Sequence, residues 1–372
     1  MRITCLFNPI SGRGRGSSEA TRLAAALEAA GHEARRLETR PADTADPEWL
    51  VRELVGVDLL VVLGGDGAVR LAAPAAGAAG VPLYQAPAGT ENLFAKSFGM
   101  RTDARTLLAA IEAWTIRRID TGLVRIGGSV EPFTIMGSIG FDASVVEDLA
   151  ASRSGPITHW SYARPILRQL RSWKPPQLRV EVDDETLAEG PAFVMVANLP
   201  DYARGLNPAR WADPADGLLD AVVFPTPNTR SLLRWAAQIA TGWHLEDARL
   251  RYRVGRRIVV ASNEPVALQL DGDAVGGGSG TRFEFEVAPA TLSVLVPPRR
   301  PAAAPLPILQ VRRSASRILP IGPGPDPTTA SARRREGDGR RPTPCRSGPF
   351  VRRRSNGRGS APDASSAADS NW

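Results

Sequence analysis

The sequence Val61-Val62-Leu63-Gly64-Gly65-Asp66-Gly67 organises the N-terminal part of the chain. An apolar run from Leu59 to Leu63 stops abruptly at three glycines arranged around one carboxylate. A continuous run of leucine and β-branched residues predicts a strand that is buried on both faces. Glycines let the backbone turn sharply and approach a ligand, and unpaired N–H groups in such a turn bind phosphate oxygens. The alternative is an ordinary turn between a strand and a helix.

Strand and helix patterns alternate on both sides of this turn. Strands are predicted at 2–7, 33–39, 58–63 and 81–86, and helices at 17–30, 47–56, 68–79 and 91–98. Pro74 is expected to interrupt the third helix. This alternation predicts an α/β domain with a doubly wound parallel sheet, whose ligands bind at the carboxyl ends of the strands.

The pattern changes at about residue 118. Short β-rich segments follow, separated by turn residues, at 119–126, 132–139, 178–183, 192–198, 219–224, 257–261, 266–270 and 282–287. Helical patterns near 160–172 and 229–241 interrupt them. We therefore predict a nucleotide-binding domain over 1–120 and a mainly antiparallel β-domain over 121–289, with a last strand at about 290–297 that returns to the first domain. The cleft between the two domains is the expected ligand site.

The net charge of +7 originates in the C-terminal segment. Residues 298–372 contain 15 Arg and five acidic residues, whereas the other 297 residues carry 31 basic and 34 acidic side chains. The segment is rich in Pro, Arg, Ser and Gly, which predicts a disordered tail. Its arginine clusters suggest contact with anionic lipid, and a solvated tail without a role is the alternative. The body of the protein has no basic excess that would predict nucleic-acid binding.

Other sequence features exclude several classes of protein. Cys5 and Cys345 do not form a disulfide framework, and no apolar run is long enough for a membrane span, so a cytoplasmic protein is expected. Neither lysine lies in a Walker sequence. The sequence from Gly12 to Ser17 departs from the G-x-G-x-x-G dinucleotide fingerprint.

Acidic residues and helix starts mark the candidate chemistry. Asp66 lies inside the glycine turn, which argues against a simple helix cap and for a cation between its carboxylate and a phosphate. Thr90 opens a predicted helix, where an anion or an ordinary N-cap are the alternatives. Asp213 to Asp220 contains three carboxylates and suits Mg²⁺ or Ca²⁺, unless it is a solvated turn. Asp271 and Asp273 could hold a metal or accept a hydroxyl proton, unless they only form a hairpin turn.

Together these blocks resemble the diacylglycerol-kinase catalytic domain family, which bacterial lipid kinases and sphingosine kinases share. The resemblance covers about residues 2–297. The matching blocks are Asn8-Pro9-x-Ser11-Gly12, Gly64-Gly65-Asp66-Gly67, Pro87 to Ala95, Arg118-Ile119-Asp120, Gly137 to Asp142, Pro208 to Asp220 and Asp271-Gly272-Asp273. It implies ATP-dependent phosphorylation of a lipid hydroxyl, with diacylglycerol as the leading acceptor, and a β-domain that binds the lipid.

The resemblance also implies roles for individual residues. ATP would contact Asn8, Pro9, Ile10, Ser11, Gly12, Thr39, Gly64, Gly65, Asp66, Gly67, Ala68, Val69, Arg70 and Thr90. Asp213, Asp216 and the carbonyl of Leu218 would hold Mg²⁺. Asp271, ahead of Asp273, would be the base that takes the hydroxyl proton.

Departures from the family pattern keep two other functions open. Ala68, Arg70 and Leu71 stand where the family has Thr, Asn and Glu, which motivates a non-catalytic regulator that binds nucleotide or lipid. An NAD kinase is the second alternative, since that related fold also carries the glycine motif. The expected partner is a lipid at the inner membrane face. A homodimer is a further hypothesis.

Overall fold

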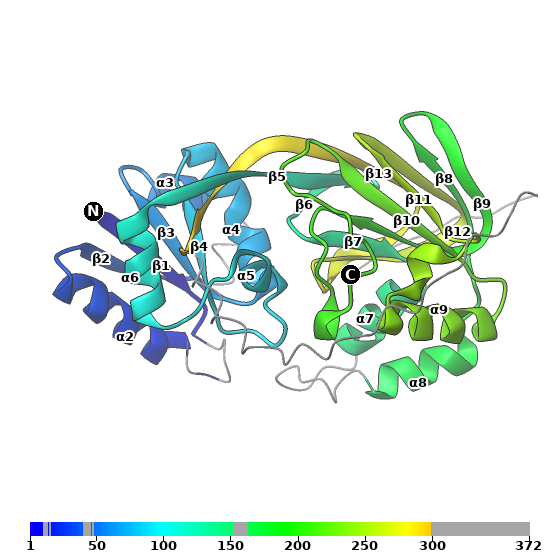
Figure 1. The fold of residues 1–372 in the computed structure, drawn as a ribbon, viewed down its shortest axis with the longest axis horizontal. Helices are drawn as coiled ribbons and strands as arrows, with labels where there is room; N and C mark the ends of the chain where they lie inside the picture. The colour runs from blue at the N-terminus through cyan, green and yellow to red at the C-terminus, as the bar shows by residue number, and fades with distance from the viewer. Residues whose placement is uncertain (10–13, 15, 40–45, 47, 152–162, 299–372) are drawn as a thin grey trace, which may run out of the picture. The chain divides into compact units, whose positions relative to one another are not determined.

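The computed structural model describes residues 1–9, 14, 16–39, 46, 48–151 and 163–298. The described residues belong to one compact unit (Figure 1). Ile10, Ser11 and Gly12, and the predicted tail beyond residue 298, lie outside the described residues.

Four parallel strands form the N-terminal part of the sheet, in the order β2–β1–β3–β4. They are β1 (Arg2–Phe7), β2 (Glu33–Glu38), β3 (Leu59–Gly64) and β4 (Leu83–Pro87). The helices between and after them are α2 (Gly16–Ala29), α3 (Trp49–Glu53), α4 (Asp66–Ala79), α5 (Leu93–Phe98) and α6 (Ala104–Ala113). Helix α2 packs against α6 and α3 packs against α4. All six residues of β3 are buried, as the apolar run predicts.

Three helices of this part differ from the prediction. Helix α4 continues through Pro74, because its alanine-rich surface is buried against β3 and the last strand. Helix α3 is shorter than 47–56, and the chain after it turns at Gly56, whose φ is +72°. Helix α6 was not predicted, although Asp103 caps it by accepting a hydrogen bond from Thr106 N at 2.9 Å.

The rest of the sheet is antiparallel within the described residues. Its strands are β5 (Thr115–Ile126), β6 (Ser129–Phe133), β7 (Met136–Ile139), β8 (Gln177–Val182), β9 (Glu185–Ala197), β10 (Leu219–Pro225), β11 (Arg251–Gly255), β12 (Arg257–Leu270) and β13 (Asp273–Val296). The helices are α7 (Phe141–Ala151), α8 (Ala163–Ser172) and α9 (Thr229–Thr241), with short turns η3 (Ala203–Gly205) and η4 (Trp243–Glu246). The predicted segment 132–139 is two strands, whereas 257–270 and 273–296 are one strand each. Helix α7 and strand β11 were not predicted.

Strand β13 joins the two kinds of pairing. It pairs in antiparallel with β12 and β5, and near its end Val294 pairs in parallel with Leu83 of β4. The long yellow strand in Figure 1 follows this path beside β5. All described strands therefore connect through hydrogen bonds in one sheet. The division into domains at about residue 120 stays a prediction.

Two hydrophobic clusters form the core. One contains the buried side chains of β1, β3, β4 and α4, and it extends to residues of β7, β9 and β10. The other fills the antiparallel strands and includes Phe133 and Phe285, whose rings are in edge-to-face contact. The first cluster includes side chains from both parts of the chain. Its close packing therefore holds the loops that follow these strands in defined positions.

Candidate active site

The glycine turn connects β3 directly to α4. Gly65 caps the helix in an extended conformation, and Asp66 is its first residue. The first N–H groups of an α-helix have no acceptor within that helix, and the helix dipole favours negative charge there. The turn therefore presents backbone donors that can bind phosphate oxygens.

Asp66 caps a different helix. Its Oδ2 accepts a hydrogen bond from Leu93 N at 3.0 Å and its Oδ1 accepts one from Phe94 N at 3.1 Å, both in the first turn of α5. Burial raises the pKa of the Asp66 carboxyl to about 6, although these two hydrogen bonds oppose the shift. Contrary to the expectation, Asp66 therefore caps a helix, whereas a cation beside its carboxylate and its contact with ATP remain predictions.

The loop after β4 lies against the glycine turn. A Cβ built on Gly89 would lie 2.6 Å from the Cα of Gly65, so the two backbones are in direct contact. Asn92, at φ +51°, fixes this loop, because its side chain accepts from Gly89 N and donates to Gly89 O, both at 2.8 Å. Asn92 occupies the N-cap position of α5, while the Asp66 side chain accepts from the first amides of the helix, so Thr90 is not the N-cap. The anion at this helix start is Asp66, and Thr90 is exposed in the loop before it.

The loop after β1 is described only in part. A Cβ on Gly16 would lie 2.2 Å from the carbonyl oxygen of Asn8, so the end of β1 packs against the start of α2. Thr39 N donates to Phe7 O at 2.9 Å, which places Thr39 beside the same strand end. Asn8, Pro9 and Thr39 thus lie near the carboxyl end of β1. Nucleotide contact by these residues remains a prediction.

Two residues of α4 that are predicted to contact the nucleotide have side chains that already contact other parts of the protein. The Val69 side chain is buried in the core, so only its main chain is available to a ligand. The guanidinium of Arg70 lies 3.9 Å from Glu131 on β6, at ion-pair distance. Ala68 is half-buried, and its side chain has no hydroxyl to donate to a phosphate.

Asp273 is brought to the glycine turn from the other end of the chain. A Cβ built on Gly67 would lie only 2.4 Å from Asp273 Oδ2, so this carboxylate rests on the first turn of α4. Asp273 is exposed and is the first residue of β13. The structure therefore places an accessible carboxylate beside the backbone donors of the turn.

Asp271 has a different environment, although it is only two residues away. It is buried, and its Oδ2 accepts from Thr134 N and Thr134 Oγ1, while its Oδ1 accepts from Ile135 N and Met136 N. These four distances are 2.8 to 2.9 Å. Burial raises the pKa of Asp271, against the effect of these bonds. Each oxygen already accepts two bonds, so Asp271 ties the turn to the 134–136 segment.

The predicted metal loop is organised by Asp120. The Asp120 carboxylate accepts from Gly217 N and Ala290 N, both at 2.7 Å, and thereby ties the loop to β13. Asp216 Oδ1 accepts from Leu218 N, and Asp213 lies 3.8 Å from Arg117. Burial raises the pKa of Asp216, and the charges of Asp213 and Asp120 add to that shift.

This loop fits a divalent cation only in part. A cation would relieve the mutual repulsion of the carboxylates, and carboxylate and carbonyl oxygens suit Mg²⁺. However, the described residues contain no group of three or more His, Cys, Asp or Glu side chains at metal-binding distances. Magnesium at Asp213, Asp216 and Leu218 therefore remains a prediction.

Asn198 is a buried residue that sequence reasoning missed. Its Nδ2 donates to Asp120 O and to Thr134 O, both at 2.9 Å. It therefore joins the strand that holds the metal loop to the segment that holds Asp271. Only its position after an apolar strand marks it in the sequence, and its two acceptors lie 78 and 64 residues away.

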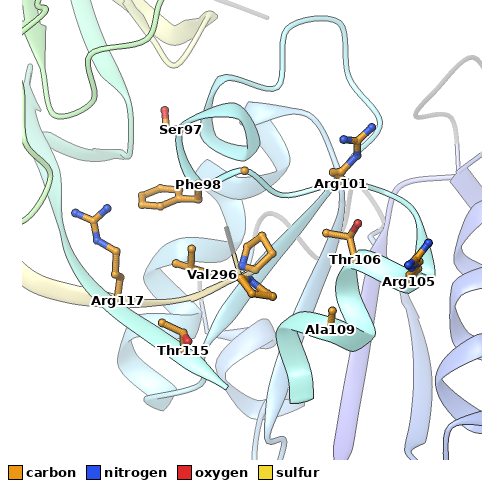
Figure 2. A pocket seen from close by; sticks show the side chains of 12 residues that line it. Ser97, Phe98, Arg101, Arg105, Thr106, Ala109, Thr115, Arg117 and Val296 are labelled. Atoms are coloured by element: carbon orange, nitrogen blue, oxygen red, sulfur yellow. The ribbon is translucent and has the colours of Figure 1, made fainter. Parts of the chain in front are cut away.

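A cavity of about 680 Å³ lies elsewhere, beside α5, α6 and the ends of β5 and β13. Figure 2 shows Arg101 and Arg105 on one side of it and Phe98 with Arg117 on the other. None of the predicted site residues lines it.

Comparison with known proteins finds one family model that matches each part of the chain. Residues 2–124 match the family model of the diacylglycerol kinase catalytic domain. Residues 136–296 match that of the YegS C-terminal NAD kinase beta sandwich-like domain. No helix among the described residues is long and apolar enough to cross a membrane.

Named relatives cover most of the chain. It is 29% identical over 302 residues to a diacylglycerol kinase of Mycobacterium tuberculosis, which covers 80% of this chain and 95% of the relative. It is 25% identical over 281 residues to a diacylglycerol kinase of Bacillus subtilis, with 74% and 90% covered. A crystal structure of a candidate diacylglycerol kinase from Bacillus anthracis str. Sterne is similar, with a TM-score of 0.62 and 18% identity over 80% of this chain and 98% of that one. That structural likeness shows the fold alone.

Proposed function

We propose that this chain is a member of the diacylglycerol kinase catalytic domain family and an ATP-dependent kinase that phosphorylates the free hydroxyl of diacylglycerol. The observation that carries the proposal is the contact between Gly67 and Asp273. It places an exposed carboxylate next to the helix start where phosphate oxygens are expected to bind. A proton acceptor beside a phosphate site is the arrangement that phosphoryl transfer to an alcohol requires.

The chain's own groups have separate tasks in this proposal. Backbone N–H groups at the start of α4 hold phosphate oxygens of the nucleotide, and the Gly65–Gly89 contact fixes the shape of that cradle. Asp273 takes the proton of the lipid hydroxyl as the hydroxyl oxygen bonds to the γ-phosphorus of ATP. The bond between the γ-phosphorus and the oxygen that leaves with ADP breaks in the same step. The proton then passes from Asp273 to solvent.

We propose Asp273 rather than Asp271 as the base, which reverses the order expected from the sequence. Both oxygens of Asp271 are already acceptors of two hydrogen bonds each, so a substrate hydroxyl would have to displace one. Losing a buried bond of this kind costs about 1–3 kcal/mol. Asp273 is exposed to solvent and lies against Gly67, where a lipid hydroxyl can approach it.

Magnesium is proposed at the 213–218 loop, on the oxygens of Asp213, Asp216 and Leu218. When bound, it would offset the negative charge of the carboxylates around it and stabilise the loop. The chain itself holds the loop through Asp120, and Arg117 partly neutralises Asp213. We also propose that the enzyme meets its lipid at the membrane surface.

The test is phosphate transfer by the purified chain with Mg-ATP. Diacylglycerol and sphingosine in mixed micelles, and NAD in solution, serve as acceptors. The expected result is transfer to diacylglycerol, with kcat reduced about 10²- to 10⁴-fold in Asp273→Asn and normal thermal unfolding. Asp271→Asn is the matched control, and its main expected effect is a lower unfolding temperature.

Each alternative gives its own result in this assay. Transfer to NAD rather than to lipid would identify an NAD kinase. Thermal stabilisation by ATP without transfer to any acceptor would indicate the non-catalytic regulator that Ala68 motivates. Loss of transfer in Asp271→Asn with unchanged stability, together with an active Asp273→Asn, would restore Asp271 as the base.

A further inference from the structure

The turn that carries Asp273 is a two-residue hairpin loop. Leu270 pairs with Asp273 across it, and Asp271 and Gly272 have φ values of +51° and +88°. Two consecutive residues at positive φ are typical of a type I′ turn. The Gly272 N–H donates to Oε1 of Gln269 at 2.8 Å, so a side chain from β12 holds the turn from within.

Gln269 is in turn held by Asp142 at the start of α7. Gln269 is buried, and its Nε2 donates to Asp142 Oδ2 at 3.1 Å and to Ser138 Oγ at 2.8 Å. Ser138 Oγ donates to the same carboxylate oxygen at 2.7 Å, and the Tyr202 hydroxyl donates to Asp142 Oδ1. Three side chains from three segments therefore converge on one half-buried carboxylate.

The chemistry of this group allows only one orientation of the Gln269 amide. An ionised carboxylate accepts hydrogen bonds and cannot donate them. The amide NH₂ must therefore face Asp142, which turns the amide oxygen toward Gly272 N–H. If the amide were reversed, two acceptors would face each other at Asp142 and two donors would face each other at Gly272. Asp142 thus acts on the Asp271–Gly272 turn through its hydrogen bond with Gln269.

We propose that Gln269 and Asp142 are positioning residues that hold the Asp273 carboxylate against Gly67. The inference rests on the proposed function, in which Asp273 is the base. The turn consists of Asp271 and Gly272. Asp271 binds the 134–136 segment, and Gly272 is held by the side chain of Gln269. These two anchors together hold Asp273, the first residue of β13, in a fixed position at the start of α4.

Gln269→Glu tests this role because it changes the amide and nearly preserves its shape. Above the pKa of the introduced carboxyl, that group and Asp142 repel each other, and the turn loses its anchor. As pH falls, a proton shared by the two carboxyls restores a donor toward Asp142. Among the described residues, Tyr202 bonds to Asp142, and Asp271 and Asp273 belong to the adjacent turn; all three are the same in the variant and in the wild type. Its kcat relative to the wild type should therefore recover as pH is lowered.

The expected result is at least a tenfold loss of kcat at pH 8, a change of KM for ATP below twofold, and partial recovery toward pH 6. Gln238→Glu is the matched control. Gln238 lies on α9, and its Nε2 donates to Asp247 Oδ2 at 3.0 Å. The substitution thus also places a carboxyl beside an aspartate, here one paired with Arg234 and Arg249 and distant from the turn. An unchanged kcat in Gln269→Glu would overturn the proposal, as would a loss that follows the unfolded fraction measured by circular dichroism.

Hydrogen exchange of the Gly272 amide, measured by NMR, tests the anchor without turnover. The wild type should protect this amide, and Gln269→Glu should release it at pH 8 while core amides stay protected. A protected Gly272 in a wild type without lipid kinase activity would refute the proposed function and leave the anchor established. Rapid exchange of Gly272 in a folded, active wild type would refute the anchor alone.

Discussion

The Asp66 carboxylate determines a pH dependence of stability. Its pKa is raised from 3.8 to about 6, chiefly by burial. A carboxyl with a raised pKa in the folded state stabilises the fold most below its unfolded pKa, and this contribution is lost as pH rises through the folded pKa. Between pH 4.5 and pH 7 the group should remove about 2 kcal/mol from the free energy of unfolding.

Asp66→Asn isolates this contribution, because asparagine does not titrate in that range. Urea unfolding of both proteins at pH 4.5 and pH 7 should show that the wild type loses about 2 kcal/mol more stability than the variant. Asp220, whose pKa burial also raises, is the same in both proteins and cancels in the difference. A difference between the two proteins that is independent of pH would show that the carboxyl titrates normally.

The sequence could not distinguish the roles of the acidic residues in the candidate site. Asp66, Asp271 and Asp273 all appeared as candidate chemical groups. Asp66 binds amides 27 and 28 residues away, and Asp271 binds groups 135 to 137 residues away. Composition and spacing give no information on such distant partners. The position of these carboxylates at strand ends was predictable, but which of them is exposed to solvent was not.

The loops after β3 and β4 are in direct contact, so a change in one loop must also displace the other. A Cβ on Gly89 would lie 2.6 Å from Gly65 Cα and 3.0 Å from Asn92 Oδ1. Gly89→Ala must therefore separate the loops and disturb the Asn92 bonds, at a cost of about 1–3 kcal/mol. We expect a lower unfolding temperature and a KM for ATP raised about tenfold, measured by calorimetry and steady-state kinetics.

Gly280→Ala is the control for this substitution. Its Cβ would meet only side-chain atoms, at 3.2 Å and beyond, and the nearest belong to Ile126. Side chains adjust more easily than backbone, so its KM for ATP should be that of the wild type. Equal KM changes in the two variants would mean that the Gly65–Gly89 contact has no special role in nucleotide binding.

Element boundaries depended on packing that local sequence does not show. Pro74 predicted an interrupted helix, yet α4 is continuous. Ala72, Ala73, Ala75 and Ala76 are buried, and a Cβ on Gly77 would lie 2.6 Å from Thr291 O on β13. The close fit of α4 to β3 and β13 thus outweighs the hydrogen bond that Pro74 cannot donate. The alternating order of the first strands and helices was predictable because it is written in local periodicity.

At the scale of the whole molecule, the end of β13 completes the parallel part of the sheet. Leu292, Val294 and Leu295 are fully buried, and Val294 pairs with Leu83. The same residues pair with the start of β5. Burying three such side chains contributes about 5–9 kcal/mol, which is comparable to the total stability of a typical domain. The N-terminal strands therefore depend on a segment more than 200 residues later in the chain.

A truncation pair tests this dependence. A chain that ends at Ala288 loses the last part of β13, and we expect it to unfold at a much lower urea concentration, with early protease cleavage in the N-terminal strands. A chain that ends at Pro298 retains every described pairing, so its unfolding midpoint should equal that of the full chain. If the shorter chain kept the wild-type midpoint, β4 would be a stable edge without β13. The parallel strands would then fold independently, and the proximity of Gly67 to Asp273 would depend on the turn anchors alone.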